Sequence, residues 1–230
     1  MNTKHTIAII GVGLVGMLTF AGTASATRPA VDLTAAKAKC DAAVAVRTAE
    51  LAKLTSKAAG AKSLSSGHLG TINDIISSST SGLSELQTKI DADTDASTLR
   101  ADCETIFTGF RIFALRAPQV HLAIVGDRQS AVVVKVGDLA TKLDAAIQKA
   151  AGNGKDVTDA TAKLADMNAK LADAAGLLPG VVDNELTFTP EQWNANHTVL
   201  SSSMTTLHTV QADLATAIAD GEAIVADLQA

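Results

Sequence analysis

Apolar residues recur along most of the chain at alternating steps of three and four positions. Such steps place side chains on one side of an α-helix, which turns once every 3.6 residues. The clearest stripes are Leu69, Ile72, Ile76, Ser79, Leu83, Leu86 and Ile90, then Leu122, Val125, Gln129, Val132, Val136, Leu139 and Leu143, then Val157, Ala160, Leu164, Met167, Leu171 and Ala174. Stripes this narrow are typical of coiled coils and long bundles. The pattern therefore predicts an all-α, elongated antiparallel helical bundle with coiled-coil-like packing.

Interruptions of this pattern divide the chain into five to six helices. The predicted helices cover residues 32–59, 64–91, 96–117, 118–151, 156–177 and 190–228. Pro118 is expected to stop or kink the third helix, because an interior proline removes a hydrogen bond and clashes with the preceding turn, at about 3 kcal/mol. The periodicity is lost over 178–189, which predicts a loop with a short extended piece at 186–189. The stretch TPEQ at 189–192 has the pattern of a capping box and predicts the start of the last helix.

The first 26 residues have the pattern of a secretory signal peptide. Lys4 gives a charged start, an apolar run follows at 7–20, and Ala-Ser-Ala at 24–26 is a small-residue cleavage pattern. The apolar run is short for a helix that spans a bilayer, so cleavage is favoured over a retained anchor. The product is expected to be secreted, either released outside the cell or held at the cell envelope by contacts.

The two cysteines of the chain, Cys40 and Cys103, are expected to form a disulfide, because an exported protein meets oxidising surroundings. In an up-down-up arrangement the first and third helices begin at the same end, and each cysteine lies about two turns into its helix. The bridge would staple the three helices of residues 27–117. Residues 118–230 carry the other helices, which either continue this bundle or form a second three-helix unit.

Composition disfavours several classes of function. The formal net charge is −5 and no cluster of Lys and Arg stands out, so nucleic acid is not an expected partner. The only later apolar run, at 120–136, is interrupted by Asp127, Arg128 and Lys135, so no transmembrane anchor is expected after signal cleavage. Aromatic residues make up 3% of the chain and Tyr is absent, which disfavours a sugar-binding cleft.

The stretch DADTDASTLRAD at 91–102 places acidic residues at positions 1, 3, 5 and 12 of a candidate calcium loop. A calcium site here would use the carboxylates of Asp91, Asp93, Asp95 and Asp102. An EF-hand loop requires Gly at position 6 and Glu at position 12, whereas this stretch has Ala96 and Asp102 there. We therefore favour a helix cap at Thr94 or Asp95, with calcium binding kept as the alternative.

Aromatic residues gather in one short segment, with Phe107, Phe110 and Phe113 interleaved with Arg111 and Arg116. Packing in the core is the first expectation for the three rings. Because the segment is also strand-like and precedes a proline, an exposed binding edge is the alternative.

Single polar residues near the apolar stripes are expected to be structural. Arg47 lies within the first stripe, where most arginines pack their stem on the core and extend the guanidinium outward. The histidines after the predicted signal peptide are His68, His121, His197 and His208, and they are expected at the surface or at its border with the core. The last two are separated by about 16 Å along a helix, too far to share one metal ion. No catalytic motif is found, so we expect neither an enzyme nor a cofactor.

Three stretches carry a resemblance to a family. They are TLRADC at 98–103 with Ile106 and Phe107, FRIFALRAPQ at 110–119, and FTPEQWNAN at 188–196. With them the chain resembles uncharacterised secreted helical proteins of actinobacteria. The resemblance implies an exported α-helical protein of such a bacterium, and it assigns no functional residues.

Taken together, these patterns favour an exported, non-catalytic helical protein that acts by contact. Its partner would be a protein or another component of the envelope, or a second copy of the chain. The alternative is a carrier of calcium or of a small ligand, which would use the turn at 91–102 or a pocket between helices.

Overall fold

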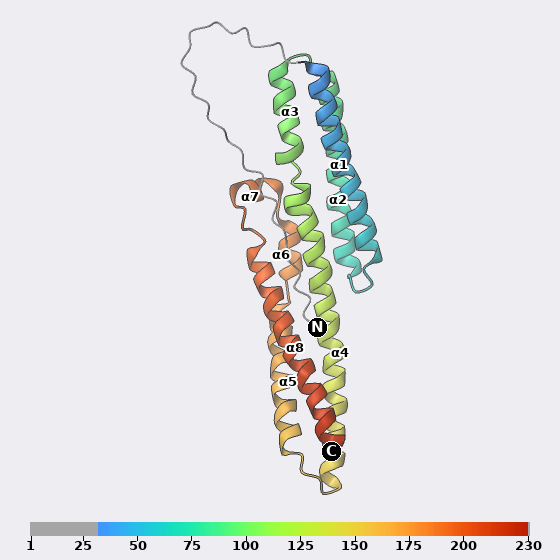
Figure 1. Cartoon of the computed structure of the whole chain (residues 1–230), viewed down its shortest axis with the longest axis vertical. Coiled ribbons are helices and arrows are strands. Elements are labelled where there is room, and N and C mark those ends of the chain that lie inside the picture. The colour runs from blue at the N-terminus through green and yellow to red at the C-terminus, as the bar shows by residue number, and fades with distance from the viewer. Residues whose placement is uncertain (1–31, 230) are drawn as a thin grey trace, which may run out of the picture. The chain divides into compact units, whose positions relative to one another are not determined.

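The structure is a computed structural model that describes residues 32–229, which belong to one compact unit. The predicted signal peptide at 1–26 lies outside these residues. The described chain is an all-α bundle and contains no β-strand, as predicted (Figure 1). The helices are α1 (Leu33–Gly60), α2 (Ser66–Ala92), α3 (Ala96–Thr108), a π-helical turn η1 (Ile112–Arg116), α4 (Ala117–Gly152), α5 (Thr158–Leu177), α6 (Val181–Thr187), α7 (Pro190–Ala195) and α8 (Ser201–Gln229).

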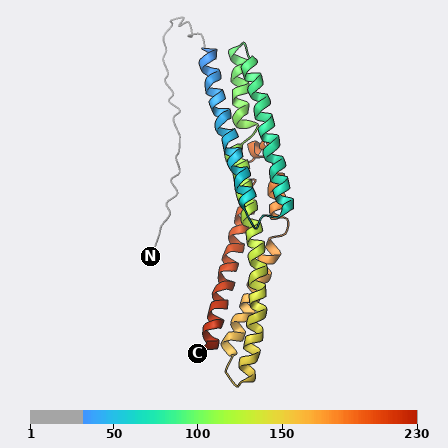
Figure 2. The same ribbon diagram turned by 90° about the vertical axis from the view of Figure 1, so that its right-hand side faces the viewer.

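Helix α4 packs against two groups of helices along its length (Figure 2). Its first half joins α1, α2, α3 and α6 in one core, where Ile72, Leu83 and Ile106 have no exposed surface. Its second half joins α5 and α8 in another core, which is centred on Met167 and Ile224. Most residues of the stripes recognised in the sequence lie in these two cores, and burial of their apolar surface stabilises the helices that carry them. Leu139 is an exception, since it is 40% exposed.

Side-chain caps fix the starts of several helices. Asp32, Ser65 and Asp95 accept hydrogen bonds from backbone N–H groups in the first turns of α1, α2 and α3. At α7, the Thr189 hydroxyl accepts from the Gln192 N–H at 3.3 Å, and the Gln192 side chain accepts from the Thr189 N–H at 2.8 Å. The predicted capping box is therefore confirmed.

The prediction that the third helix runs to Pro118 is wrong, because α3 ends at Thr108. Arg111 has a φ of 48°, a left-handed conformation that no α-helix continues. The chain restarts with η1, and Pro118 lies in the first turn of α4, where a missing N–H removes no hydrogen bond. The break therefore precedes the proline.

The predicted loop at 178–189 is also wrong over most of its length, and the extended piece predicted at 186–189 is limited to Phe188 and Thr189. Residues 181–187 form α6, which begins after Gly180, a residue with a φ of 74°. A helix of seven residues is marginal by itself in water. Its burial of Val182 and Leu186 in the first core stabilises it, and this contact is invisible in the local pattern.

The last predicted helix is interrupted rather than continuous. Helix α7 ends at Ala195 and α8 begins at Ser201. Between them, the side-chain oxygen of Asn196 accepts hydrogen bonds from the N–H and the hydroxyl of Thr198, at 3.0 and 2.7 Å. Asparagine often forms such local turns in competition with a helix.

The predicted bridge between α1 and α3 is confirmed at the level of distance, because the sulfur atoms of Cys40 and Cys103 lie 1.96 Å apart and their Cα atoms 5.6 Å apart. The bridge closes a separation of 63 residues in the chain. Replacing Cys40 and Cys103 by Ser is expected to lower the free energy of unfolding by about 2–5 kcal/mol, because the unfolded chain loses its constraint. Urea unfolding followed by circular dichroism measures this change. Equal midpoints for the variant and the oxidised wild type would contradict it.

Candidate functional site

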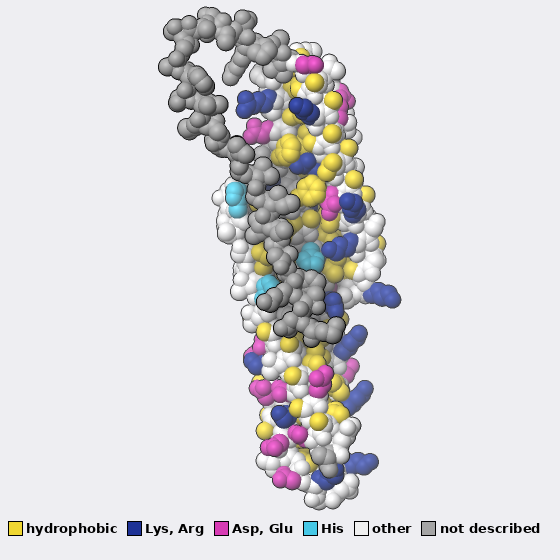
Figure 3. All heavy atoms as spheres, in the orientation of Figure 1, with side chains coloured by type: hydrophobic (Ala, Val, Ile, Leu, Met, Phe, Trp, Pro, Cys, Tyr) yellow, Lys and Arg dark blue, Asp and Glu magenta, His cyan; other side chains and the backbone are white. Residues whose placement is uncertain are grey.

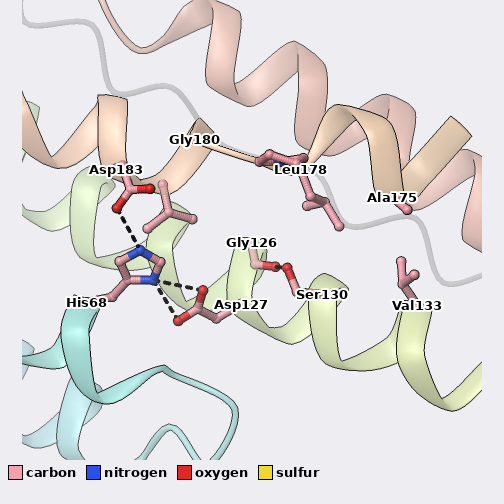
Figure 4. Close-up of a pocket in the computed structure, with 11 residues that line it drawn as sticks. His68, Gly126, Asp127, Ser130, Val133, Ala175, Leu178, Gly180 and Asp183 are labelled. Carbon is pink, nitrogen blue, oxygen red and sulfur yellow. Dashed lines mark hydrogen bonds and ion pairs between the residues drawn. The ribbon is translucent and has the colours of Figure 1, made fainter. Parts of the chain in front are cut away.

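One histidine links three helices near the middle of α4 (Figure 4). His68, in the first turn of α2, lies with Nδ1 2.9 Å from both carboxylate oxygens of Asp127 on α4. Its Nε2 lies 3.1 Å from a carboxylate oxygen of Asp183 on α6. We call His68, Asp127 and Asp183 the histidine cluster.

Asp127 anchors the start of α2 as well as the imidazole. Its side chain is only 10% exposed, and it accepts a second hydrogen bond, from the Ser65 N–H at 2.6 Å. Ser65 is the cap of α2, and its hydroxyl accepts from the His68 N–H at 3.1 Å. The first turn of α2 is therefore held to α4 by a carboxylate with two donors, which satisfies this largely buried charge.

The two carboxylates favour the charged form of the imidazole. Burial alone lowers the pKa of His68, but hydrogen bonds and charge from Asp127, and then from Asp183, outweigh it and raise the pKa above the usual histidine range. Only the doubly protonated ring can donate to both carboxylates at once.

Glu185 on α6 is an acidic residue with an unusual degree of burial. It has no exposed surface, and neither of its carboxylate oxygens has a hydrogen-bond partner. Burial, reinforced by the negative charge of Asp127, raises the pKa of Glu185 to about 8. The protonated, neutral form of the side chain therefore predominates at pH 7.

A cavity of about 330 Å³ opens beside the histidine cluster. Its wall combines polar groups of the cluster with Ser130 and with the apolar side chains of Val133, Leu178 and Val182. Helix α6 can approach α4 this closely because Gly126 has no side chain. A Cβ atom at that position would lie 2.5 Å from a methyl group of Val182.

The polar side chains at the cavity link helices to one another, and they are not arranged as a nucleophile with a general base. Both ring nitrogens of His68 face carboxylates, so neither is free to accept a proton from a hydroxyl. The Ser130 hydroxyl itself donates to the backbone carbonyl of Gly126 at 3.1 Å.

A second feature lies on the surface of α1, α3 and η1. Phe107 and Phe113 are 47% and 49% exposed, which is unusual for aromatic side chains, and Val46, which precedes Arg47 on α1, is 56% exposed. The guanidinium of Arg47 lies 4.1 Å from the ring centre of Phe107 and 5.7 Å from that of Phe113. We call these four residues the aromatic face. In Figure 3, hydrophobic side chains gather on this side of α1 and α3.

The expectation that all three phenylalanines pack in the core is therefore wrong for Phe107 and Phe113. Phe110 does pack against the core, and its ring reaches the backbone of α2 because Gly82 has no side chain there. The break at Arg111 explains the exposure of Phe113, since it shifts burial after α3 to Ile112 and Leu115. Phe107 lies before the break, next to the buried Ile106.

Arg47 extends outward as predicted, and it is held in place. Its guanidinium donates to the Ala43 carbonyl at 3.0 Å. Burial lowers the pKa of Arg47, which remains far above neutrality for an arginine. Within residues 32–229 no carboxylate lies within ion-pair distance of it. The aromatic face therefore presents a stacked positive charge between two rings.

Helix α7 is joined to the break after α3 by side chains of Arg111, Trp193 and Asn194. The guanidinium of Arg111 lies 4.7 Å from the ring centre of Trp193, and its Nε donates to the Asn194 side chain. Asn194 in turn donates to the carbonyl of Thr108 at 3.0 Å.

Several acidic residues of the turn at 91–102 have structural roles. Asp95 caps α3, one of the two residues expected to do so, and hydrogen bonds from the Ser97 and Thr98 hydroxyls hold its pKa well below the usual range. The carbonyl of Asp91 accepts from the Lys37 ammonium at 2.6 Å, and Asp93 ends α2. Within residues 32–229, no three His, Cys, Asp or Glu side chains, Asp102 included, form a group that could hold a metal ion.

Three histidines are exposed as expected, namely His121, His197 and His208. Burial and the nearby Lys57 ammonium lower the pKa of His121, and His197 stacks beside Trp193 with ring centres 4.2 Å apart. His68 was missed as a linking residue because its partners are 59 and 115 positions away in the chain. The signal that could have found the cluster is Asp127, a lone acid in an apolar run.

The chain matches no family model, no curated protein and no solved structure. In the part of the chain that the structure describes, no helix combines the length and the apolar character needed to span a membrane.

Replacing Asp127 by Asn tests the histidine cluster. The variant is expected to lower the pKa of His68, because the larger of its two carboxylate contributions is removed, and to destabilise the fold by about 1–3 kcal/mol, because the Ser65 and His68 donors lose a charged acceptor. Imidazole resonances followed by NMR against pH measure the first effect, and urea unfolding measures the second. The matched control is Asp138→Asn, an exposed acid on the same helix. An unchanged His68 titration in Asp127→Asn would contradict this account.

Proposed function

We propose that the protein is an exported, non-catalytic helical module that binds a protein of the cell envelope through its aromatic face. The observation that carries the proposal is the exposure of Phe107 and Phe113 around the stacked guanidinium of Arg47. Exposed aromatic and arginine side chains supply much of the binding energy at protein interfaces.

The bridge between α1 and α3 supports this proposal, because it joins the two helices that carry most of the face. Phe107 lies one turn after Cys103 on α3, and Arg47 lies two turns after Cys40 on α1. A face whose helices are already fixed loses little conformational entropy on binding.

The chemistry of the face indicates the kind of partner. Two rings and a valine favour an apolar surface, and the guanidinium between them favours a carboxylate within that surface. An amphipathic segment that carries Asp or Glu among apolar residues meets both requirements. We therefore propose such a segment of an envelope protein as the occupant.

The test compares wild-type protein, collected after export, with the double variant Phe107→Ser and Phe113→Ser. Each is sedimented with envelopes of the bacterium that produces it, with calcium and with a chelator. Wild type is expected to bind saturably in both conditions, and the double variant is expected to bind at least about tenfold more weakly, because loss of two interface rings removes 1.4 kcal/mol or more.

The control is Val134→Ser, which removes a 65% exposed apolar side chain from α4, outside the aromatic face. It is expected to bind as wild type does. Equal binding by the double variant, or no sedimentation of the wild type, would refute the proposal.

A second candidate function is that of a small-ligand carrier, which the cavity beside His68 favours. Its volume of about 330 Å³ is at the lower end of the range for ligand pockets. Native mass spectrometry of protein collected after export would detect a retained molecule of discrete mass. Binding to envelopes only in calcium would instead favour the carboxylates at 91–102.

A further inference from the structure

Helix α6 is held in place by the burial of Val182 and Leu186 and by the Gln119 side chain, which donates to the carbonyls of Glu185 and Phe188 at 2.5 and 3.0 Å. Two further contacts of α6 depend on the protonation of the side chains that make them. The exposed Asp183 side chain contacts His68, whereas Glu185 is fully buried, and Val182 and Leu186 are nearly so. With seven residues, α6 depends on these tertiary contacts for its stability.

The outer contact requires a doubly protonated imidazole. A neutral ring has one N–H, so it can donate to Asp127 or to Asp183 but not to both. Asp183 is the partner that is lost, because its side chain is 74% exposed and can be hydrated, whereas that of Asp127 is 10% exposed and also accepts from Ser65. Loss of this proton therefore removes the side-chain link between α6 and α2, and only the apolar contacts of the shared core remain between them.

The inner contact requires a neutral carboxyl group. Glu185 has no exposed surface and no hydrogen-bond partner for either side-chain oxygen, so an ionised form there would be a buried, uncompensated charge. The charge can reach water only if α6 moves away from α4. The position next to Asp127 adds repulsion to this cost.

From these two contacts we propose that α6 is a pH-controlled latch, which is closed on α2 and α4 while His68 and Glu185 carry protons and opens the adjoining cavity when they lose them. This device is independent of the aromatic face, which lies on other helices.

The charged surroundings of the latch are few. The titratable groups there are His68 on α2, Asp127 on α4, and Asp183 and Glu185 on α6 itself. Helix α8 presents uncharged Ser202, Ser203 and Thr206 to α6. After the end of α6, the guanidinium of Arg116 donates to the carbonyl of Phe188 at 3.0 Å. Arg116 is not among the groups that shift the pKa of His68 or of Glu185.

The direction of the pH effect follows from the closed and open forms. The pKa of Glu185 falls from about 8 in the closed form toward the ordinary 4.5 when α6 opens, so opening releases a proton between these values. Rising pH therefore favours opening, and the effect is complete above pH 8. His68 acts in the same direction, since its raised pKa also falls when Asp183 leaves. Its share is smaller because Asp127 stays in contact.

Amide hydrogen exchange of the exported protein from pH 5 to 9, corrected for the intrinsic pH dependence of exchange, tests the latch. Protection of residues 181–187 is expected to fall by about tenfold per pH unit between pH 5 and 8, because one proton is released per opening. Protection of residues 160–174 in α5 is expected to stay constant. Constant protection of α6 over the same range would overturn the proposal.

Two variants separate the contributions. Glu185→Gln keeps the shape of the neutral acid and is expected to abolish most of the pH dependence, and His68→Gln is expected to remove only the remainder. An unchanged slope in Glu185→Gln would also overturn the proposal. If either variant fails to fold, the ¹³C shift of the Glu185 carboxyl in the wild type decides the matter. Titration near pH 8 supports the latch, and titration near the ordinary 4.5 refutes it.

Discussion

The burial of both halves of α4 is the constraint on which the other helices depend. Helix α4 has 36 residues, and its apolar side chains enter one core with α1, α2 and α3 and another with α5 and α8. Because a helix isolated in water is only marginally stable, each neighbour gains its stability from the surface that it buries against this shared element. The histidine cluster lies where the two groups of helices meet on α4, and Asp127 is buried there with its hydrogen bonds satisfied.

The aromatic face and helix α6 depend on this arrangement of helices in different ways. The aromatic face lies on α1 and α3, which the bridge joins, and on η1, which follows the backbone break at Arg111. Helix α6 is short, begins after a glycine in the left-handed conformation, and carries Asp183 and Glu185, whose contacts we propose to depend on protonation. One region is therefore suited to rigid recognition and the other to movement, since regions with few stabilising contacts open most easily.

Much of the fold could be predicted from the sequence, because helical period and capping are local properties. The stripe from Leu69 to Ile90, the cap at Asp95 and the capping box at 189–192 are all present. The pairing of Cys40 with Cys103 could be predicted because two helical hairpins have a simple geometry. By contrast, α6 and the break at Arg111 depend on tertiary packing, which overrides local preference. The histidine cluster joins residues far apart in the chain, and no local pattern records that proximity.

The measurement that tests the central claim most directly is site-specific photocrosslinking of the exported protein to native envelopes. A photoreactive residue at Val46, within the aromatic face, is compared with one at Val134 on α4, which is similarly exposed. Our account predicts one discrete protein product from position 46 and none from position 134. Equal products from both positions, or a product from position 134 alone, would contradict the proposal that the aromatic face is the binding surface.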